Sequence, residues 1–409
     1  MNPNTVVIVG GGQAGLAVSQ ALTPLGVDHV VLERGRVAQT WRERWDSFCL
    51  VTPNWTMSLP EFPYDGGEPE GFVARDEIVR FLERFARSFK LPVQEGVDVR
   101  SVAMEGGEFA LATSAGEVRT RHLVLCSGAY QRPHRPPAAE GFPKGLLVVD
   151  AEQYKNPAAL PPGRVLVVGS GQTGCQLADE LVGAGRDTYL SCGRAPWSVR
   201  RAGGRDIVTW LNQTNWFETP LSALPTPAAR LTANVQVSGR DGGRDVHYRS
   251  LQARGVHLTG RLEGISAGKA HFAGDLAESV AWADGRYEAM RKLFREQLPA
   301  KGLPVPELPD PEPFSFEAPT EVSLDGFGAV VFTSGFRPDY ARWVHLPAFD
   351  ELGFPVTDEG ASTLIPGLYF AGVHFLRKRK SALIFGVGED AAIVARKVAA
   401  RRGALPLPA

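Results

Sequence analysis

The sequence predicts an α/β protein made of two similar units. Two stretches nearly repeat each other 159 residues apart: VVIVGGGQAGLAVSQAL at residues 6–22 and VLVVGSGQTGCQLADEL at residues 165–181. Each begins with a run of aliphatic, largely β-branched residues, continues with Gly-x-Gly-x-x-Gly, and ends in a segment with helical spacing of apolar residues. This order indicates a strand, a tight turn and a helix. We therefore expect two Rossmann-like domains, each with a parallel sheet and with β-meander or helical additions.

The glycines of each turn predict a dinucleotide site. Gly10 allows the turn, Gly12 lets the backbone approach a pyrophosphate, and Gly15 lets the helix pack closely on the strand. The helix N-terminus adds free N–H groups and the positive end of the helix dipole. The second copy repeats the glycines as Gly169, Gly171 and Gly174, and the residues that follow the middle glycines are Gln13 and Gln172. An ordinary strand-to-helix turn is the alternative for either copy alone.

The strand after each turn indicates which nucleotide is bound. In such units an acidic residue about 20 positions on holds a ribose hydroxyl, whereas an arginine accommodates a 2′-phosphate. Glu33 ends the predicted strand HVVLE, 23 residues after Gly10. The first unit therefore suits FAD or NAD, and we assign the nearby Arg34 and Trp41 to the same site.

The corresponding position in the second unit carries no carboxylate. The same offset from Gly169 leads to Cys192 in TYLSCGRAPWSVRR, where Arg194, Arg200 and Arg201 follow. A guanidinium group is well suited to contact a phosphate. We therefore predict NADPH at the second site, with Arg194 as a contact. A solvated basic loop is the alternative.

Composition excludes several classes of protein. The 409 residues allow two or three domains, and 44% hydrophobic with 22% charged residues is typical of soluble globular proteins. A net charge of −1 gives no reason to expect nucleic acid or an anionic membrane as partner. No apolar run reaches the length of a membrane span. Because the first predicted strand begins within six residues of Met1, we expect no signal peptide and a cytoplasmic protein.

The cysteines and histidines argue against a redox dithiol and a metal site. The four cysteines include no C-x-x-C or other close pair, so a thiol-disulfide reductase is not expected. The eight histidines lack the H-x-x-x-H and H-x-H spacings of metal ligands. No G-x-S-x-G nucleophile motif is present.

The remaining segments are expected to complete and connect the two units. An amphipathic helix is predicted over residues 75–89, and residues 98–128 are predicted to form a β-meander that leads into a buried strand. The end of that strand, LVLCSGAYQRP, resembles AVVFTSGFRPD at 329–339, and we interpret both as crossings between units. The predicted domains are 1–155 with 331–409 for FAD, and an inserted 156–330 for NADPH with helical or substrate-lining additions. The Pro-rich residues 303–314 are expected to be an ordered surface connection.

Taken together, these motifs resemble the class B flavin monooxygenases. The resemblance rests on the two glycine-rich units, the TW segment after Glu33, and GFPKGLLVVDAEQYKNP before the second unit, and it is least clear for residues 197–316. The family includes flavin-containing monooxygenases, YUCCA-type enzymes, N-hydroxylases and Baeyer–Villiger enzymes. The resemblance implies FAD in the first unit and NADPH in the second. It also implies transfer of one oxygen atom of O2 to a small organic substrate through a flavin hydroperoxide.

One family fingerprint is only partly matched. Flavin-containing monooxygenases carry F-x-G-x-x-x-H-x-x-x-Y-K/R before the second unit. Here Phe142, Asp150, Tyr154 and Lys155 correspond to it, with Asp in place of His and two extra residues after Phe142. The Baeyer–Villiger form has Trp-Pro where this chain has Tyr154-Lys155. The resemblance therefore favours N- or S-oxygenation and leaves Baeyer–Villiger or YUCCA-type carbonyl oxidation as an alternative.

The resemblance also suggests catalytic residues. The family places a Thr-Asn or Leu-x-Pro element beside the reactive edge of the flavin, so Thr52 and Asn54 in LVTPNW are the catalytic candidates, with a simple turn after Pro as the alternative. Val373 and His374 stand where related flavoproteins carry Asp. The run RKRK at 377–380 is expected to be a solvated face. An apolar pocket is expected to draw on Trp41, Trp45, Trp55, Trp210 and Trp216.

Two functions of other classes remain open beside the monooxygenase. One is a flavin reductase that passes electrons to a protein partner, and the other is a nucleotide-binding regulator without turnover. Oxygen incorporation, oxygen-independent reduction of a partner, and absence of turnover distinguish the three. The sequence leaves open the substrate and the oligomeric state, for which a homodimer is allowed.

Overall fold

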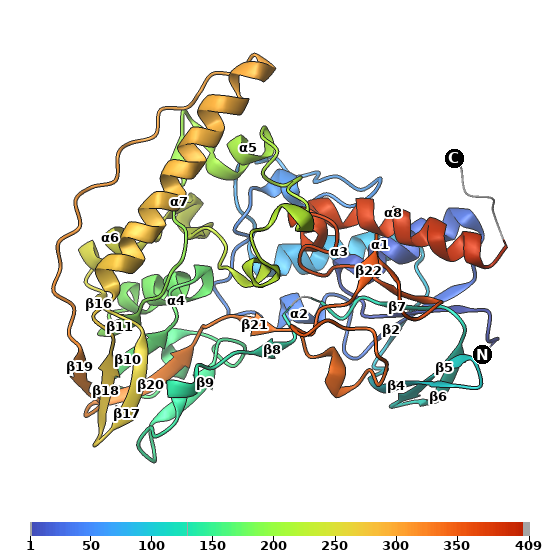
Figure 1. Cartoon of the computed structure of the whole chain (residues 1–409), viewed down its shortest axis with the longest axis horizontal. Coiled ribbons are helices and arrows are strands. Elements are labelled where there is room, and N and C mark those ends of the chain that lie inside the picture. The colour runs from blue at the N-terminus through green and yellow to red at the C-terminus, as the bar shows by residue number, and fades with distance from the viewer. Residues whose placement is uncertain (1, 129, 404–409) are drawn as a thin grey trace.

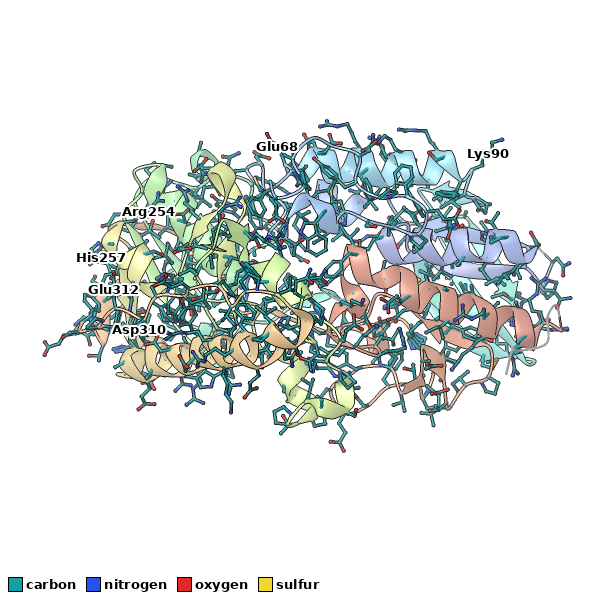
Figure 2. All side chains as sticks on the ribbon, turned by 90° about the horizontal axis from the view of Figure 1, so that it is seen from above. Glu68, Lys90, Arg254, His257, Asp310 and Glu312 are labelled. Atoms are coloured by element: carbon teal, nitrogen blue, oxygen red, sulfur yellow. The ribbon has the colours of Figure 1, made fainter. Side chains whose placement is uncertain are left out.

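The computed structural model describes residues 2–128 and 130–403, and it confirms the predicted α/β fold. Two sheets lie at opposite ends of the molecule, and each is covered by its own helices (Figure 1). Figure 2 shows the same two halves from above, with Lys90 on the first unit and Arg254, His257 and Asp310 on the second.

The first unit is built on a seven-stranded sheet. Its order is β22 (Thr357–Asp358), β23 (Ala361–Ser362), β24 (Leu368–Phe370), β7 (Leu123–Leu125), β1 (Val6–Val9), β2 (His29–Glu33) and β3 (Val93–Glu95). The strands from β24 to β3 are parallel. All four side chains of β1 are buried, because both faces of the sheet are covered.

Alternate residues of β1 enter different cores, as the two-residue period of a strand requires. Val6 and Ile8 belong to the core formed with α1 (Gln13–Leu22), α3 (Arg75–Ser88) and α8 (Ile384–Arg401). Val7 and Val9 belong to the core under the antiparallel meander β4 (Val99–Glu105), β5 (Glu108–Thr113) and β6 (Gly116–Thr120). The predicted helix over 75–89 and the predicted meander are thus confirmed. The short α2 (Gln39–Arg42) follows β2.

The second unit is built on a five-stranded parallel sheet. Its order is β16 (His257–Thr259), β11 (Thr188–Ser191), β10 (Arg164–Val168), β20 (Phe327–Phe332) and β9 (Leu147–Asp150). Val165 and Val167 pack in the core that includes α4 (Gln172–Gly183), α6 (Tyr248–Ala253) and α7 (Leu276–Gln297). Leu166 and Val168 pack on the other face with the antiparallel sheet β17 (Leu262–Ser266), β18 (Lys269–Phe272) and β19 (Glu321–Ser323). The short α5 (Ile207–Asn212) also belongs to this half of the chain.

The chain crosses between the units at two paired strands. β8 (Arg132–Pro133) and β21 (Phe336–Arg337) form an antiparallel pair between the halves (Figure 1). Both strands lie at the Arg-Pro segments that follow LVLCSG and AVVFTSG, which the sequence predicts to be crossings between the units. β9 pairs with β20 in the second sheet, although the boundary at 155 assigned its residues to the first domain. We therefore propose that the second unit extends from after β8 to before β21.

Short elements complete the chain. Two further antiparallel pairs are β12 (Arg201–Ala202) with β13 (Arg205–Asp206), and β14 (Val237–Ser238) with β15 (Arg244–Asp245). Residues 303–314 contain no helix or strand and follow the surface of the second unit from α7 toward β19 (Figure 1). Within residues 2–128 and 130–403, no helix combines the length and apolar character that crossing a membrane requires.

Candidate functional site

The first glycine turn has the geometry that a pyrophosphate site requires. Gly10 has a φ of 111°, and a Cβ there would lie 2.4 Å from the Cys126 carbonyl oxygen. A Cβ on Gly15 would lie 1.9 Å from the Gly10 carbonyl oxygen, so helix and turn touch directly. Gly12 precedes α1 without a side-chain cap, and a Cβ on it would meet no atom within 4 Å. The start of α1 thus has no side-chain cap and has free space beside Gly12, which fits a bound phosphate.

Glu33 is buried and fixed at the end of β2. The Gly11 N–H donates to Oε2 at 2.6 Å, and the Gly35 N–H donates to Oε1 at 2.8 Å. Each carboxylate oxygen keeps further acceptor capacity. The carboxylate is thus held beside the glycine turn, in the position expected for a contact with a ribose hydroxyl.

The other predicted residues of the first site differ in position. The Trp41 indole N–H donates to Gln13 Oε1 at 3.0 Å, and Gln13 Nε2 donates to the Ala382 carbonyl at 3.4 Å. Gln13 therefore connects the α1 N-terminus with α2 and the segment before α8. Arg34 is exposed and pairs loosely with Glu43 at 3.9 Å. Its role at the cofactor stays a prediction.

The second glycine turn repeats the geometry of the first. Gly169 has a φ of 110°, and a Cβ there would lie 2.9 Å from backbone atoms of Thr333. A Cβ on Gly174 would lie 1.8 Å from the Gly169 carbonyl oxygen. Gly171 precedes α4 without a side-chain cap, and its nearest neighbour would be Ala233 at 3.5 Å. This turn also leaves a helix N-terminus available to a phosphate.

Polar side chains brace this second turn, which sequence reasoning did not anticipate. Gln236 Nε2 donates to the Ser170 carbonyl at 2.5 Å, and Gln172 Nε2 donates to the Val237 carbonyl at 3.5 Å. The Tyr248 hydroxyl donates to the Gly193 carbonyl at 2.5 Å, beside the end of β11. Gln236 and Tyr248 lie more than sixty residues after the turn, and no motif marks them.

The three arginines after β11 have different environments. Arg194 is exposed directly after the buried Cys192, where the prediction places the 2′-phosphate contact. Arg201 is exposed and donates to the Glu70 and Gly242 carbonyls. Arg200 does not belong to a solvated basic loop, because its side chain is 2% exposed and paired with Asp206.

The two catalytic candidates, Thr52 and Asn54, differ in their burial and in their hydrogen bonds. Asn54 is buried, its Nδ2 donates to the Glu68 carbonyl at 2.8 Å, and its Oδ1 accepts from the Val73 N–H at 2.7 Å. Its amide therefore joins two loop segments, which agrees with the turn alternative. Thr52 is half-buried, and its hydroxyl lies 2.6 Å from that of Thr56. A catalytic role for either residue stays a prediction.

Aromatic side chains from both units meet near this turn. The centres of the Trp55 and Phe385 rings lie 5.6 Å apart in an edge-on arrangement, and those of Phe385 and Phe217 lie 5.1 Å apart. Trp45 and Trp210 are 4% and 3% exposed and belong to the core. Of the five tryptophans predicted to line an apolar pocket, Trp41, Trp55 and Trp216 are partly accessible.

The C-terminal segment closes on the first glycine turn. Gly372 has a φ of 73°, and a Cβ there would lie 2.6 Å from the Cβ of Ala14 in the first turn of α1. His374 follows, with its ring 5.1 Å from Tyr130. Burial lowers the pKa of His374 to about 4, so the ring is neutral at pH 7. A neutral imidazole thus stands where related flavoproteins carry a carboxylate.

The fingerprint residues before β10 make contacts with both units. Asp150, which replaces the family histidine, pairs with Arg135 through bonds of 2.8 and 3.0 Å. The Tyr154 hydroxyl donates to Glu180 Oε2 at 3.0 Å, and Lys155 Nζ donates to the Glu43 carbonyl at 2.5 Å. This segment therefore connects the residues around Glu43 with α4.

The RKRK run is not the solvated face that its charge suggested. Lys378 and Lys380 are 16% and 13% exposed, and both pair with Glu218 and Glu389. Arg377 Nε donates to Asp390 at 2.6 Å. The local charge pattern does not reveal these ion pairs, because Glu218 lies about 160 residues before the run.

A large polar hollow lies elsewhere on the first unit. It is lined by Asn4, Gly107, Arg121, His122, Pro366, Arg401 and Arg402. His122 precedes β7, so this hollow lies at the amino end of that strand, whereas the glycine turns follow the carboxyl ends of β1 and β10. It is therefore separate from the candidate cofactor sites.

Comparisons with known proteins identify the family to which the chain belongs. The family model described as pyridine nucleotide-disulphide oxidoreductase matches residues 7–222. An uncharacterized CzcO-like oxidoreductase of Geobacillus kaustophilus is 28% identical, over 94% of this chain and 95% of its own. Indole-3-pyruvate monooxygenase YUCCA4 of rice is 33% identical, over 43% of this chain and 44% of its own. A solved variant of a flavin monooxygenase from Stenotrophomonas maltophilia is similar in fold, with a TM-score of 0.70 and 20% identity, over 98% of this chain and 100% of that one.

Proposed function

Because the chain belongs to the pyridine nucleotide-disulphide oxidoreductase family, with relatives among the class B flavin monooxygenases that its motifs resemble, we propose that it is an NADPH-dependent flavin monooxygenase that oxygenates nitrogen or sulfur. FAD belongs to the first unit and NADPH to the second. When bound, the two cofactors supply hydride transfer and activation of O2. The substrate is a small organic molecule with a soft nucleophilic nitrogen or sulfur atom.

The observation that carries this proposal is the difference between the two glycine turns. Both leave a helix N-terminus open to a phosphate, but one is followed by the fixed carboxylate of Glu33 and the other by Cys192 and Arg194. A carboxylate suits an unphosphorylated ribose, and an exposed guanidinium suits a 2′-phosphate. This asymmetry supports FAD in one unit and NADPH in the other.

The chain's own residues would position the reactants and exclude water. Gln13 and Trp41 hold the first turn against the segment before α8, while Trp55, Phe217 and Phe385 provide apolar surface between the units. A dry, prearranged site strengthens each hydrogen bond offered to developing charge. Thr52, on the same turn as Trp55, is our candidate donor to activated oxygen, with Asn54 supporting the turn.

The family description also suggests a second candidate, a disulfide reductase, and the cysteines oppose it. Cys126, Cys175 and Cys192 are buried, and burial raises the pKa of the Cys126 thiol to about 12. A thiol with so high a pKa forms little of the reactive thiolate at pH 7. Cys49 is half-buried, burial raises its pKa too, and no second cysteine lies near it in the sequence.

Oxygen incorporation tests the proposal. Purified protein, NADPH and ¹⁸O2 would be incubated with a panel of small amines, hydroxylamine precursors, thioethers and ketones. We expect ¹⁸O in a nitrogen or sulfur product, in proportion to NADPH consumed. Label in an ester from a ketone would indicate Baeyer–Villiger chemistry instead. NADPH oxidation that needs a protein acceptor and proceeds without O2 would indicate a reductase.

A further inference from the structure

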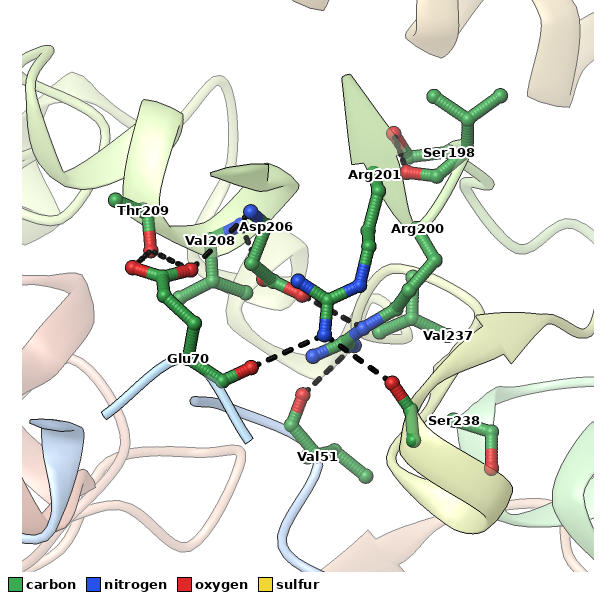
Figure 3. Close-up of polar contacts among 12 residues, drawn as sticks. Val51, Glu70, Ser198, Arg200, Arg201, Asp206, Val208, Thr209, Val237 and Ser238 are labelled. Atoms are coloured by element: carbon green, nitrogen blue, oxygen red, sulfur yellow. Dashed lines mark hydrogen bonds and ion pairs between the residues drawn. The ribbon is translucent and has the colours of Figure 1, made fainter. Parts of the chain in front are cut away.

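The turn that carries Thr52 and Asn54 is held by the second unit at two points. Arg200 NH1 donates to the Val51 carbonyl at 2.9 Å (Figure 3). The Trp55 indole N–H donates to Thr209 Oγ1 at 3.0 Å. Both ends of the turn are thus hydrogen-bonded to residues that lie about 150 positions later in the chain.

Arg200 is buried and ion-paired at this contact. Its Nε lies 2.8 Å from Asp206 Oδ2, and the two side chains are 2% and 0% exposed. The guanidinium carbon lies 4.0 Å from the centre of the Phe72 ring. Burial lowers the pKa of Arg200 to about 10 and raises that of Asp206 to about 6, so both partners are charged at pH 7. A buried pair of this kind is a poor source of stability but defines one geometry.

The surrounding backbone leaves little room for a different geometry. A Cβ on Gly239 would lie 2.2 Å from the Leu50 carbonyl oxygen. Gly243 has a φ of 94°, and a Cβ there would lie 2.5 Å from the Phe72 ring. The loop of the second unit therefore lies directly against Leu50, at the start of the turn, and against Phe72.

Glu70 extends the same contact. Thr209 Oγ1 accepts from the Trp55 indole N–H. The same hydroxyl donates to the Glu70 carboxylate at 2.9 Å, and Arg201 donates to the Glu70 carbonyl at 3.1 Å (Figure 3). Asn54 ties the turn to Glu68 and Val73 on either side of Glu70. Residues 50–55 and 68–73 therefore form one body held by Arg200, Arg201 and Thr209.

We propose that Arg200 and Thr209 are positioning residues that link the loop carrying Arg194 to the turn carrying Thr52. The proposal rests on the proposed function, because it gives this turn its role in oxygen chemistry. Arg194 and Arg200 lie on one segment after β11, so a nucleotide bound at Arg194 acts on the same loop that holds Val51. The turn is then correctly placed when nucleotide is bound.

The position of the turn would then decide whether NADPH oxidation yields oxygenated product or H2O2. In productive turnover NADPH, a proton, O2 and substrate give NADP⁺, water and the oxygenated product. When the turn is displaced, NADPH, a proton and O2 give NADP⁺ and H2O2. Loosening the turn should therefore raise H2O2 per NADPH and leave the hydride transfer itself unchanged.

Two conservative variants test this in the holoenzyme. Arg200→Lys keeps a charge but loses the forked contact, and Thr209→Val keeps the shape but loses both hydrogen bonds. We expect H2O2 per NADPH to rise about three- to tenfold in each, with FAD content and anaerobic flavin reduction by NADPH unchanged. Arg205→Lys, on an exposed arginine beyond this contact, is the matched control and should match the parent. Parental H2O2 yield in both variants would overturn the proposal.

A second readout does not depend on oxygen. Trp55 reports on the turn, so NADP⁺ should change the tryptophan emission of the parent, and Trp55→Phe should remove that change. We expect Arg200→Lys and Thr209→Val to lose the change while NADP⁺ still binds. A parental response in both variants would overturn the proposed link. A parent that never consumes O2 yet shows the emission change would refute the proposed function and leave the link between loop and turn intact.

Discussion

At the scale of single residues, Gly12 offers a direct test of the FAD site. A Cβ there meets no protein atom within 4 Å, so Gly12→Ala should fold normally while its methyl enters the space assigned to the pyrophosphate. We expect FAD affinity to fall roughly tenfold or more, about 1.4 kcal/mol, measured as flavin per protein after dialysis. Gly171→Ala is the matched control and should weaken NADPH binding instead. Unchanged flavin content in folded Gly12→Ala would remove the assignment.

Arg194 should determine the preference between nucleotides. A charge-assisted contact to a 2′-phosphate is worth roughly 1.5–3 kcal/mol, so Arg194→Ala should lower kcat/KM for NADPH by about one to two decades. The value for NADH should hardly change. Arg205→Ala serves as the control, because Arg205 is also exposed but stacks on Trp210. Equal loss with both nucleotides would show that Arg194 does not recognise the phosphate.

Thr52 and Asn54 should separate into a chemical and a structural residue. Asn54→Ala leaves the Val73 N–H and the Glu68 carbonyl without their partner, at a cost of about 1–3 kcal/mol in unfolding free energy. Thr52→Val should keep stability and raise H2O2 per NADPH. Urea unfolding and peroxide assays measure the two effects. Peroxide leakage from a fully stable Asn54→Ala, with none from Thr52→Val, would return the chemical role to Asn54.

At this scale the sequence was informative only where function imposes local spacing. The two glycine turns and the position of Glu33 beside the first turn could be predicted, because this strand-turn-helix motif has fixed intervals between residues; their role in binding cofactors stays a prediction. Arg200 could not, because its partners Val51, Phe72 and Asp206 come from three separate segments. A basic residue in a loop gives no local sign that it is buried.

At the scale of secondary-structure elements, the start of α6 predicts a pH dependence. His247 precedes this helix, is 9% exposed and lies 4.6 Å from the Trp197 ring. Burial, followed by the charge of Arg249, lowers its pKa to about 4 from an ordinary value of 6.5. The folded protein thus binds fewer protons than the unfolded chain between these values. The stability that His247 contributes is complete above pH 6.5 and is lost as pH falls toward 4.

Replacing His247 should remove that part of the pH dependence. His247→Asn introduces a residue favoured at helix N-termini that does not titrate. We expect the loss of unfolding free energy between pH 6.5 and 4 to be smaller than in the parent by on the order of 2–3 kcal/mol, measured by urea unfolding at several pH values. His345→Asn, at an exposed position, is the control. A pH profile identical to that of the parent would exclude His247 as a cause of acid instability.

The elements themselves were largely predictable, and their assignment to sheets was less so. β1 and β10 follow from short runs of aliphatic, largely β-branched residues before the glycine turns, and α3 follows from the helical spacing of its apolar residues. β9 has only four residues and half-buried side chains, so nothing local indicates which sheet it joins. That pairing is decided by β20, which lies far later in the sequence.

At the scale of the whole molecule, function depends on how the two units are held together. Arg200 and Thr209 form one contact between them, and a cluster of Glu218, Lys378, Lys380 and Glu389 forms another. Backbone bonds run beside the cluster, from the Arg379 N–H to the Thr219 carbonyl at 2.9 Å. A hydride donor and acceptor in separate units must meet within a narrow range of distances. Under the proposed function, these contacts would therefore serve the chemistry as well as the fold.

The charge cluster should respond to reversal and to salt. Glu218 contacts Lys378 at 2.5 Å and Lys380 at 2.6 Å, so Glu218→Lys would bring three ammonium groups together. Because Glu218 is 48% exposed, screening limits the expected loss of unfolding free energy to about 1 kcal/mol. Urea unfolding should show this loss at low ionic strength, and NaCl at roughly 0.5 M should reduce it. Lys380→Glu in the same chain should restore part of the stability, because it pairs the new lysine with a carboxylate again. A loss that salt does not change and that the second substitution does not relieve would show that the cluster does not hold the units together.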